Sequence, residues 1–240
     1  MTPPLILPLS QCIDVGITGG KAVGLARLIA AGFSVPPGLC ITTAAYEQAL
    51  RTAGIQDLDP WPAICPLPEI ERRSTLSSHR NQIKRIDISQ LASQCLAALK
   101  ALNRPSNVRW AVRSSATNED STHTSFAGLY RTHLGLPLPE IEGAIKDLWI
   151  SLWEERVVGY MVRQKFHAPP RMAVLIQPMV DARTAGVGYA IHPVTGRRNQ
   201  VMINAIPGLA APLVDGTIAP DQYVVKSPMM GNQSPFIHAS

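Results

Sequence analysis

Residues 110–120 read Trp-Ala-Val-Arg-Ser-Ser-Ala-Thr-Asn-Glu-Asp. Apolar side chains alternate with more polar ones as far as Arg113, a period-two pattern that predicts a half-buried strand ending at this residue. Beyond it we expect a loop with hydroxyl side chains and two carboxylates, followed by Gly128 and Thr132. An arginine, hydroxyl groups and a glycine are the groups needed to grip a polyphosphate. This segment is therefore the first candidate for a functional site.

The same residues also allow a structural interpretation. Arg113 could form an ion pair with Glu119 or Asp120. The hydroxyl side chains of Ser114, Ser115 and Thr117 could cap turns.

A second candidate lies in residues 18–32, where a glycine turn opens a predicted helix that ends at Gly32. Two adjacent glycines, Gly19 and Gly20, leave backbone N–H groups free to approach an anion. Lys21 adds a positive charge at the same place. A helix cap beside a solvated lysine explains the pattern equally well, because the complete GxxxxGK[ST] loop is absent.

Composition narrows the class of protein. The chain has 240 residues and 46% apolar residues, so a buried core is expected. Its apolar runs are too short for the roughly 20-residue membrane span, and no signal peptide is recognised at the N-terminus, so we expect a cytoplasmic protein without membrane contact. The four cysteines form no CxxC pair and are expected to be reduced. A net charge of +5 suits the phosphates of a nucleotide. The sequence has no basic run with interleaved aromatic residues, so we do not expect nucleic acid as a partner.

The remaining patterns predict an α+β fold with two lobes flanking a cleft. Residues 56–88 have no sustained periodicity and are expected to form a surface excursion, and residues 227–240 a disordered tail. A polar Gln177 in the apolar run 172–180 is either hydrogen-bonded to neighbours or aimed at a ligand. The expected helices cover 18–32, 44–53, 89–102, 139–152 and 154–166, and the expected strands 108–113, 172–180, 186–191, 200–204 and 222–226.

Five blocks of the sequence form a recognisable set. They are Gly19-Gly20-Lys21 with Leu25, 32–38 with Thr42-Thr43-Ala44 and Tyr46, 113–120 with 125–128, 174–180 with 186–196, and 220–223. These blocks, in this order, resemble the N-terminal ATP-binding domain shared by phosphoenolpyruvate synthase, pyruvate phosphate dikinase and rifampicin phosphotransferase. The resemblance covers residues 11–226 and implies a two-lobed ATP-grasp-like fold, incomplete at the C-terminus.

The resemblance implies roles for five residues. Lys21 and Arg113 match the cations that contact the phosphates and offset charge during phosphoryl transfer, and they are the expected catalytic residues. Gly128 and Thr132 match the loop over the phosphates, and Gln177 a residue beside the adenine or ribose. The implied ligand is ATP, and the implied acceptor is a histidine on a separate phosphotransfer domain.

Departures from the family pattern bear on activity. Asn204 and Ala211 stand where the family usually has glutamates. Mg²⁺ is expected for the family, but its ligands are not identifiable in this sequence. The leading hypothesis is an ATP-binding domain that is inactive alone. The alternatives are a degenerate, non-catalytic nucleotide- or partner-binding module, and one piece of a split enzyme.

Overall fold

The computed structural model describes residues 3–55, 60–118, 129–166 and 171–226. The chain divides into two compact units, Met1–Met179 and Val180–Ser240. Both units combine antiparallel sheets with helices, so the predicted α+β class is confirmed. In the described part of the chain, each helix is too short or too polar to cross a membrane.

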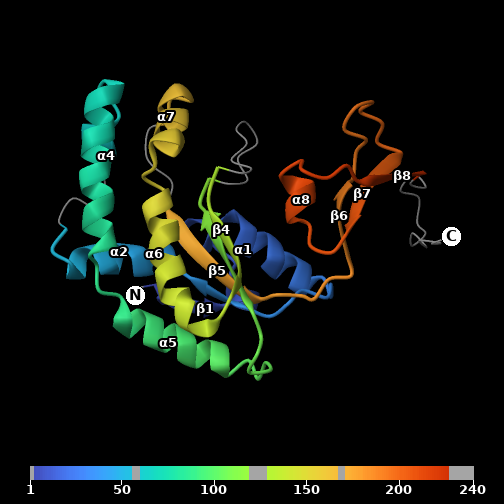
Figure 1. Ribbon diagram of the computed structural model, residues 1–240, viewed down its shortest axis with the longest axis horizontal. Coiled ribbons are helices and arrows are strands. Elements are labelled where there is room, and N and C mark those ends of the chain that lie inside the picture. The colour runs from blue at the N-terminus through green and yellow to red at the C-terminus, as the bar shows by residue number, and fades with distance from the viewer. Residues whose placement is uncertain (1–2, 56–59, 119–128, 167–170, 227–240) are drawn as a thin grey trace. The chain divides into compact units, whose positions relative to one another are not determined.

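The first unit is built on a five-stranded sheet with the order β1-β2-β5-β3-β4, in which every neighbouring pair is antiparallel (Figure 1). The strands are β1 (Ile6–Pro8), β2 (Leu39–Ile41), β3 (Trp110–Ala116), β4 (Thr132–Leu136) and β5 (Met172–Pro178). The helices are η1 (Leu9–Gln11), α1 (Val15–Ala30), α2 (Thr43–Thr52), α3 (Trp61–Ile64), α4 (Glu69–Lys84), α5 (Ser89–Lys100), η2 (Leu138–Glu140), α6 (Ile141–Ser151) and α7 (Glu155–Arg163).

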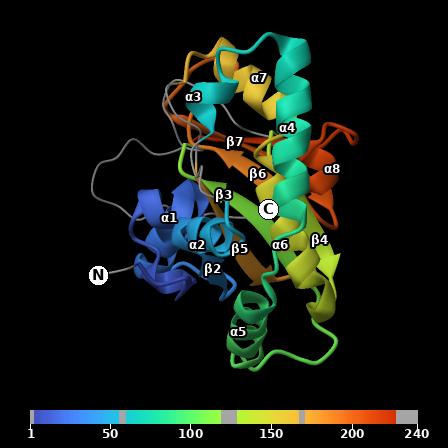
Figure 2. The ribbon, with the colours of Figure 1, turned by 90° about the vertical axis from the view of Figure 1, so that its left-hand side faces the viewer.

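Strand β5 is the centre of this unit. All seven of its residues are buried, as expected for a nearly continuous apolar run covered on both faces. Its odd-numbered side chains Ala173 and Leu175 pack with α1, and its even-numbered ones, Val174 and Ile176, join the larger core that includes α6. Figure 2 shows α1 and α6 on opposite sides of the sheet.

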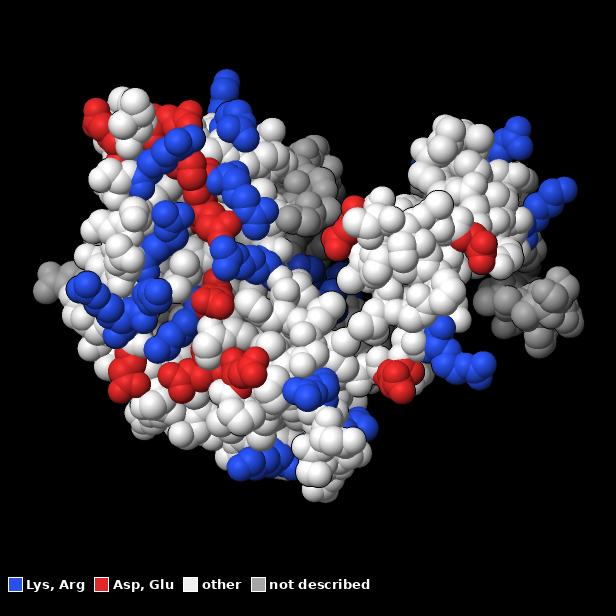
Figure 3. Space-filling view, in the orientation of Figure 1, with Lys and Arg blue, Asp and Glu red and all other residues white. Residues whose placement is uncertain are grey.

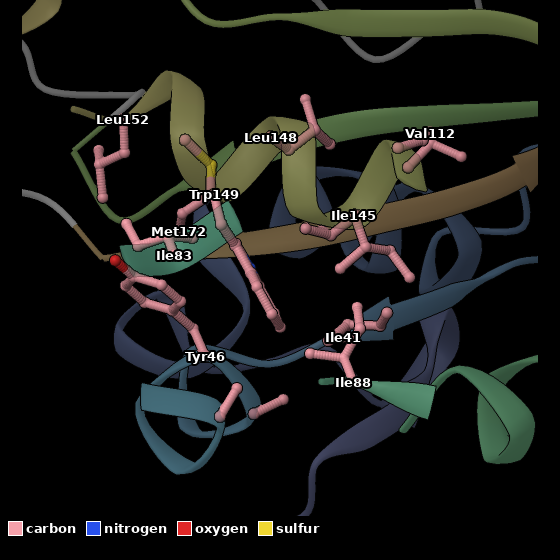
Figure 4. Packing of buried hydrophobic residues seen from close by; sticks show 14 of the residues in the cluster. Ile41, Tyr46, Ile83, Ile88, Val112, Ile145, Leu148, Trp149, Leu152 and Met172 are labelled. Atoms are coloured by element: carbon pink, nitrogen blue, oxygen red, sulfur yellow. The ribbon is translucent and has the colours of Figure 1, made fainter. Parts of the chain in front are cut away.

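The larger core combines aliphatic and aromatic side chains, and Figure 4 shows Tyr46 and Trp149 among isoleucine, leucine and valine residues. Tyr46 of α2 and Trp149 of α6 have ring centroids 5.2 Å apart, within the range of favourable aromatic pairs. Trp153 is buried as well, and its Nε1–H donates to the hydroxyl of Tyr46 at 2.9 Å. Both polar atoms are therefore satisfied inside the apolar core.

The expectation of a surface excursion over residues 56–88 was wrong for its described part, because α3 and α4 form there. Leu76 and Ile83, seven residues apart on α4, are fully buried in the main core. Arg72 of the same helix lies 2.6 Å from Glu155 of α7 through Nη2 and Oε1. Tertiary contacts thus stabilise a helix whose sequence is too polar to show a clear apolar stripe.

Several predicted boundaries also differ. Strand β3 continues to Ala116, so Arg113 lies in mid-strand and not at a strand end, because pairing with β5 extends to Ala116 opposite Met172. Helix α2 starts at Thr43, one residue before the predicted start, and the hydroxyl of Thr43 donates to the carbonyl of Gly16. Helix α5 ends at Lys100, two residues before the predicted end at residue 102.

The second unit contains the three-stranded antiparallel sheet β6-β7-β8. Its strands are β6 (Thr184–Tyr189), β7 (Gln200–Pro207) and β8 (Asp221–Lys226), with the short helix α8 (Ala211–Val214) after β7. The predicted strands are therefore present. The predicted tail 227–240 lies outside the described residues.

Charged side chains of both signs are interspersed over the part of the first unit that carries α4, α6 and α7 (Figure 3). Several form ion pairs, including Arg73 with Glu69 on α4 and Arg156 with Glu154 beside α7. This face therefore presents a mixed surface and no continuous basic stripe.

Candidate functional site

Helix α1 is kinked at Gly19, where φ is +75° and ψ is 167°. A side chain at this position would place its Cβ 2.0 Å from the carbonyl oxygen of Ser115 in β3. Glycine is thus needed both for the left-handed φ and for the close approach of two main chains. The sequence predicted glycines that free the backbone for an anion; the neighbour seen at Gly19 is instead strand β3.

The hydroxyl of Ser115 joins the two sides of this kink. Its Oγ accepts a hydrogen bond from the N–H of Ala22 at 3.1 Å and donates to the carbonyl of Thr18 at 2.8 Å. Ser115 is fully buried. The sequence suggested that this hydroxyl could cap a turn. In the structure it does bond to the main chain of a turn, and this turn belongs to α1.

Lys21 lies directly after the kink and bonds to Ser114. At the two ends of β3, the carbonyl of Arg109 accepts from the N–H of Met179, and the N–H of Thr117 donates to the carbonyl of Arg171. The main-chain N–H and C=O groups of the odd-numbered residues of β3 therefore point to β5, and those of the even-numbered residues point to β4. The ladder with β4 ends at the pair Arg113 and Thr132. The carbonyl of Ser114 lies beyond that ladder and accepts from Lys21 Nζ at 3.1 Å, and Ser114 Oγ accepts at 3.3 Å.

Three of the predicted residues share one face of the sheet. Arg113 is opposite Thr132 on β4, and Gln177 on β5 is opposite Ala111, two residues before Arg113. Because paired residues and alternate residues of a strand share a face, Arg113, Thr132 and Gln177 all lie on the face that carries α1. Arg113 is partly exposed and Thr132 is exposed. Lys21 reaches the residue next to Arg113, so the structure brings these four residues to one region.

Gln177 is held by its own neighbours. It is 7% exposed, and its Nε2 donates to the carbonyl of Pro36 at 2.9 Å. Gly38 packs so closely that an added Cβ would lie 2.7 Å from Gln177 Cγ. Of the two alternatives for this polar residue in a buried strand, a hydrogen bond to neighbours is therefore observed.

Gly128 lies outside the described residues. So do Glu119 and Asp120, the two carboxylates suggested as ion-pair partners of Arg113.

Sequence reasoning missed the residues behind the glycine turn. The carbonyl of Thr18 accepts from Ser115 and also from the thiol of Cys40 at 3.6 Å. A hydrogen bond with Cys12 and burial raise the pKa of the Cys40 thiol, which keeps it protonated as a donor. All four cysteines are free, as predicted. A spacing of more than 90 residues between Thr18 and Ser115 leaves no sequence signal for their contact.

A cavity of about 340 Å³ lies beside the beginnings of α1 and α2. Glu47 lies at its wall, with Oε1 3.0 Å from Arg171 and Oε2 3.7 Å from Arg51. It is a second place with basic side chains, and Arg113 is not among its lining residues. Its lining residues are Pro3, Gly16, Ile17, Thr43, Ala44, Glu47, Gln48, Arg51 and Arg171.

Comparison with known proteins identifies the class. Residues 15–238 match the family model described as "Pyruvate phosphate dikinase, AMP/ATP-binding domain". The match extends over most of the chain, so the protein belongs to this family of nucleotide-binding domains. The resemblance predicted from the five motif blocks is confirmed.

Named relatives agree with this assignment. A phosphoenolpyruvate synthase from Pyrococcus furiosus is 31% identical over 253 residues, which cover 89% of this chain and 31% of that protein. One from Aeropyrum pernix is 35% identical over 223 residues, covering 87% and 27%. A rifampicin phosphotransferase from Bacillus cereus is 34% identical over 215 residues, covering 88% and 25%. The chain therefore spans about a third or less of the length of these relatives.

Proposed function

We propose that this chain binds ATP on the α1 face of the sheet in its first unit, with Lys21 and Arg113 contacting the phosphates. The observation that supports this most is the position of Lys21, whose ammonium bonds to the residue next to Arg113. Two cations in one region offset the charge of a polyphosphate, and an arginine can bind two phosphate oxygens at once. The face also remains partly open at Arg113 and Thr132.

Three further residues, Thr132, Gly128 and Gln177, are proposed to contact the nucleotide. Thr132 has an exposed hydroxyl opposite Arg113 and can donate to a phosphate oxygen. Gly128 belongs to the same proposed loop over the phosphates. The side chain of Gln177 is held by its hydrogen bond to the carbonyl of Pro36. We propose that it lies beside the adenine or ribose, where its amide oxygen can accept a hydrogen bond.

In the complete reaction, we propose that the chain supplies the nucleotide for transfer of a phosphoryl group to a histidine on a separate domain. The relatives named phosphoenolpyruvate synthase and rifampicin phosphotransferase are three to four times as long as the aligned region. We also propose that the domain has the two-lobed, ATP-grasp-like fold that the resemblance implies. Lys21 and Arg113 would stabilise negative charge that develops on the transferring group.

Magnesium is implied by the resemblance, but the described residues do not fit a protein-held ion. Within the described ranges, three or more His, Cys, Asp or Glu side chains do not gather at any one place. Asn204 stands where the family usually has a glutamate, and its Oδ1 accepts from Gln222 Nε2 at 3.2 Å. We therefore assign the ion no ligand and no step in this chain.

The same observation supports a second candidate, a degenerate module that binds nucleotide or a partner without catalysis. An amide engaged with Gln222 cannot supply the charge of the carboxylate it replaces. Release of phosphate from ATP by the isolated chain in the presence of Mg²⁺ would contradict this candidate.

Calorimetric titration with ATP tests the leading proposal. Lys21→Ala and Arg113→Ala should each weaken ATP binding about 10- to 100-fold, as expected for a lost charge-assisted hydrogen bond. Lys100→Ala and Arg104→Ala, which remove exposed cations elsewhere, are the matched controls and should leave the affinity unchanged. Equal affinities for the wild type and both site variants would overturn the proposal.

A further inference from the structure

We propose that Ser115 is a positioning residue, which sets the place of Lys21 by inserting its hydroxyl into the hydrogen-bond ladder of α1. The inference rests on the proposed function, because it assigns how the same site is organised. In an uninterrupted α-helix, the N–H of Ala22 would donate to the carbonyl of Thr18. Here Ser115 Oγ accepts from that N–H at 3.1 Å and donates to that carbonyl at 2.8 Å. Lys21 lies inside the bridged turn.

The bridge explains the kink. A side chain that enters the ladder is one of the recognised causes of a sharp bend in a helix. Gly19 supplies the left-handed φ of +75° that opens the turn, and its Cα packs against the main chain of Ser115. The hydroxyl and the main chain of Ser115 in β3 together therefore fix the place where the second segment of α1 begins.

The hydroxyl of Ser115 has no capacity for a direct phosphate contact as a donor. A serine has one O–H to donate, and that of Ser115 points at Thr18. The side chain is also completely buried. The three residues of the Arg-Ser-Ser sequence thus have separate tasks: Arg113 faces the ligand, Ser114 holds the ammonium of Lys21, and Ser115 places the turn from which Lys21 extends.

Loss of the hydroxyl has a definite structural consequence. The N–H of Ala22 and the carbonyl of Thr18 would both lose a buried partner, and the simplest way to satisfy them is to bond to each other. That bond would straighten the turn. Lys21 would then move away from Ser114 and from the region of Arg113.

A double-mutant cycle on ATP affinity separates positioning from mere support of the fold. Ser115→Ala should weaken ATP binding about fivefold to tenfold in the wild-type background and have no further effect in the Lys21→Ala background. Ser151→Ala is the matched control, because Ser151 is equally buried and its hydroxyl donates to Leu148 within α6. It should lower the melting temperature to a similar extent and leave the affinity unchanged.

A second readout does not depend on nucleotide. The acetylation rate of Lys21 by a water-soluble acylating reagent, measured by mass spectrometry with Lys100 as internal reference, should rise severalfold in Ser115→Ala and stay constant in Ser151→Ala. Ser115→Cys keeps a donor and an acceptor at this position, both weaker and on a larger sulfur atom, and should give intermediate values, which covers the case in which the alanine variant does not fold.

The outcomes distinguish the two proposals. A raised Lys21 acetylation rate in Ser115→Ala, with ATP affinity unaffected by any variant, would support the positioning role and overturn the proposed function. An unchanged acetylation rate, or losses of affinity from Ser115→Ala and Lys21→Ala that simply add, would overturn the positioning role while ATP binding stands.

Discussion

Lys21 Nζ donates to the carbonyl oxygen of Ser114 at 3.1 Å, and this bond links the start of the kinked helix to the arginine-bearing strand. The ladder between β3 and β4 ends at Arg113 and Thr132, so the carbonyl of Ser114 lies beyond it and takes the ammonium group of Lys21 as its donor. A long, flexible side chain is thereby held in one orientation before any ligand binds. Pre-organisation of this kind reduces the entropy that binding would otherwise cost.

Replacement of Gly19 tests the close contact between α1 and β3. Gly19→Ala should lower the free energy of unfolding by about 3 kcal/mol or more, because the new Cβ would lie 2.0 Å from a main-chain oxygen at a φ of +75°. Gly24→Ala in the same helix is the control. Its Cβ would meet no described atom within 4 Å, and it should stabilise the protein by about 0.5–1 kcal/mol. Urea denaturation measures both, and equal stabilities would contradict this packing.

The exposed hydroxyl of Thr132 should matter for nucleotide binding and not for folding. Thr132→Val keeps the shape and the β-branching of the side chain but removes the donor proposed for a phosphate oxygen. We expect ATP affinity to fall about 2- to 10-fold without a change in melting temperature. Thr184→Val, at an exposed strand position in the second unit, controls for the loss of a surface hydroxyl; if it weakens binding as much, the effect is not specific to the site.

The buried pair of Tyr46 and Trp153 predicts a stability effect in the main core. Tyr46→Phe removes the acceptor of the Trp153 indole N–H, which donates at 2.9 Å inside the core. An unsatisfied buried donor costs about 1–3 kcal/mol, so the free energy of unfolding should fall by that amount. Tyr223→Phe, at a residue that is 55% exposed, should be neutral, and thermal denaturation compares the two.

Thiol reactivity should follow burial. Cys65 is partly exposed, whereas Cys12, Cys40 and Cys95 are buried. Burial raises the pKa of Cys95 to about 12, so below that pH its thiol is protonated and a poor nucleophile. In the native protein at pH 8, a disulfide exchange reagent should label Cys65 first, and Cys65→Ser should abolish the fast phase. A fast phase that persists in this variant would show that a buried thiol is accessible.

Several features could be predicted from the sequence because they depend on local patterns. The continuous apolar run of β5 indicated a strand covered on both faces, and the structure confirms it. The roles of Lys21 and Arg113 came from the resemblance to a family and stay predictions. Other features depend on contacts between distant segments. Pairing with β5 extends β3 to Ala116, and packing of Leu76 and Ile83 turns a polar stretch into a helix. The hydrogen bonds from Ser115 to Thr18 and Ala22 form only when strand β3 and helix α1 pack together, so the periodicity of the sequence could not predict them.

Amide NMR spectra of ¹⁵N-labelled protein during an ATP titration locate the bound nucleotide and so test whether ATP binds on the face that carries Lys21 and Arg113. We expect saturable shift changes at the amides of Gly20, Lys21, Arg113 and Thr132, which disappear in the Arg113→Ala variant at the same ATP concentration. Shift changes confined to residues around Glu47, Arg51 and Arg171, or no shift changes at all, would contradict this expectation.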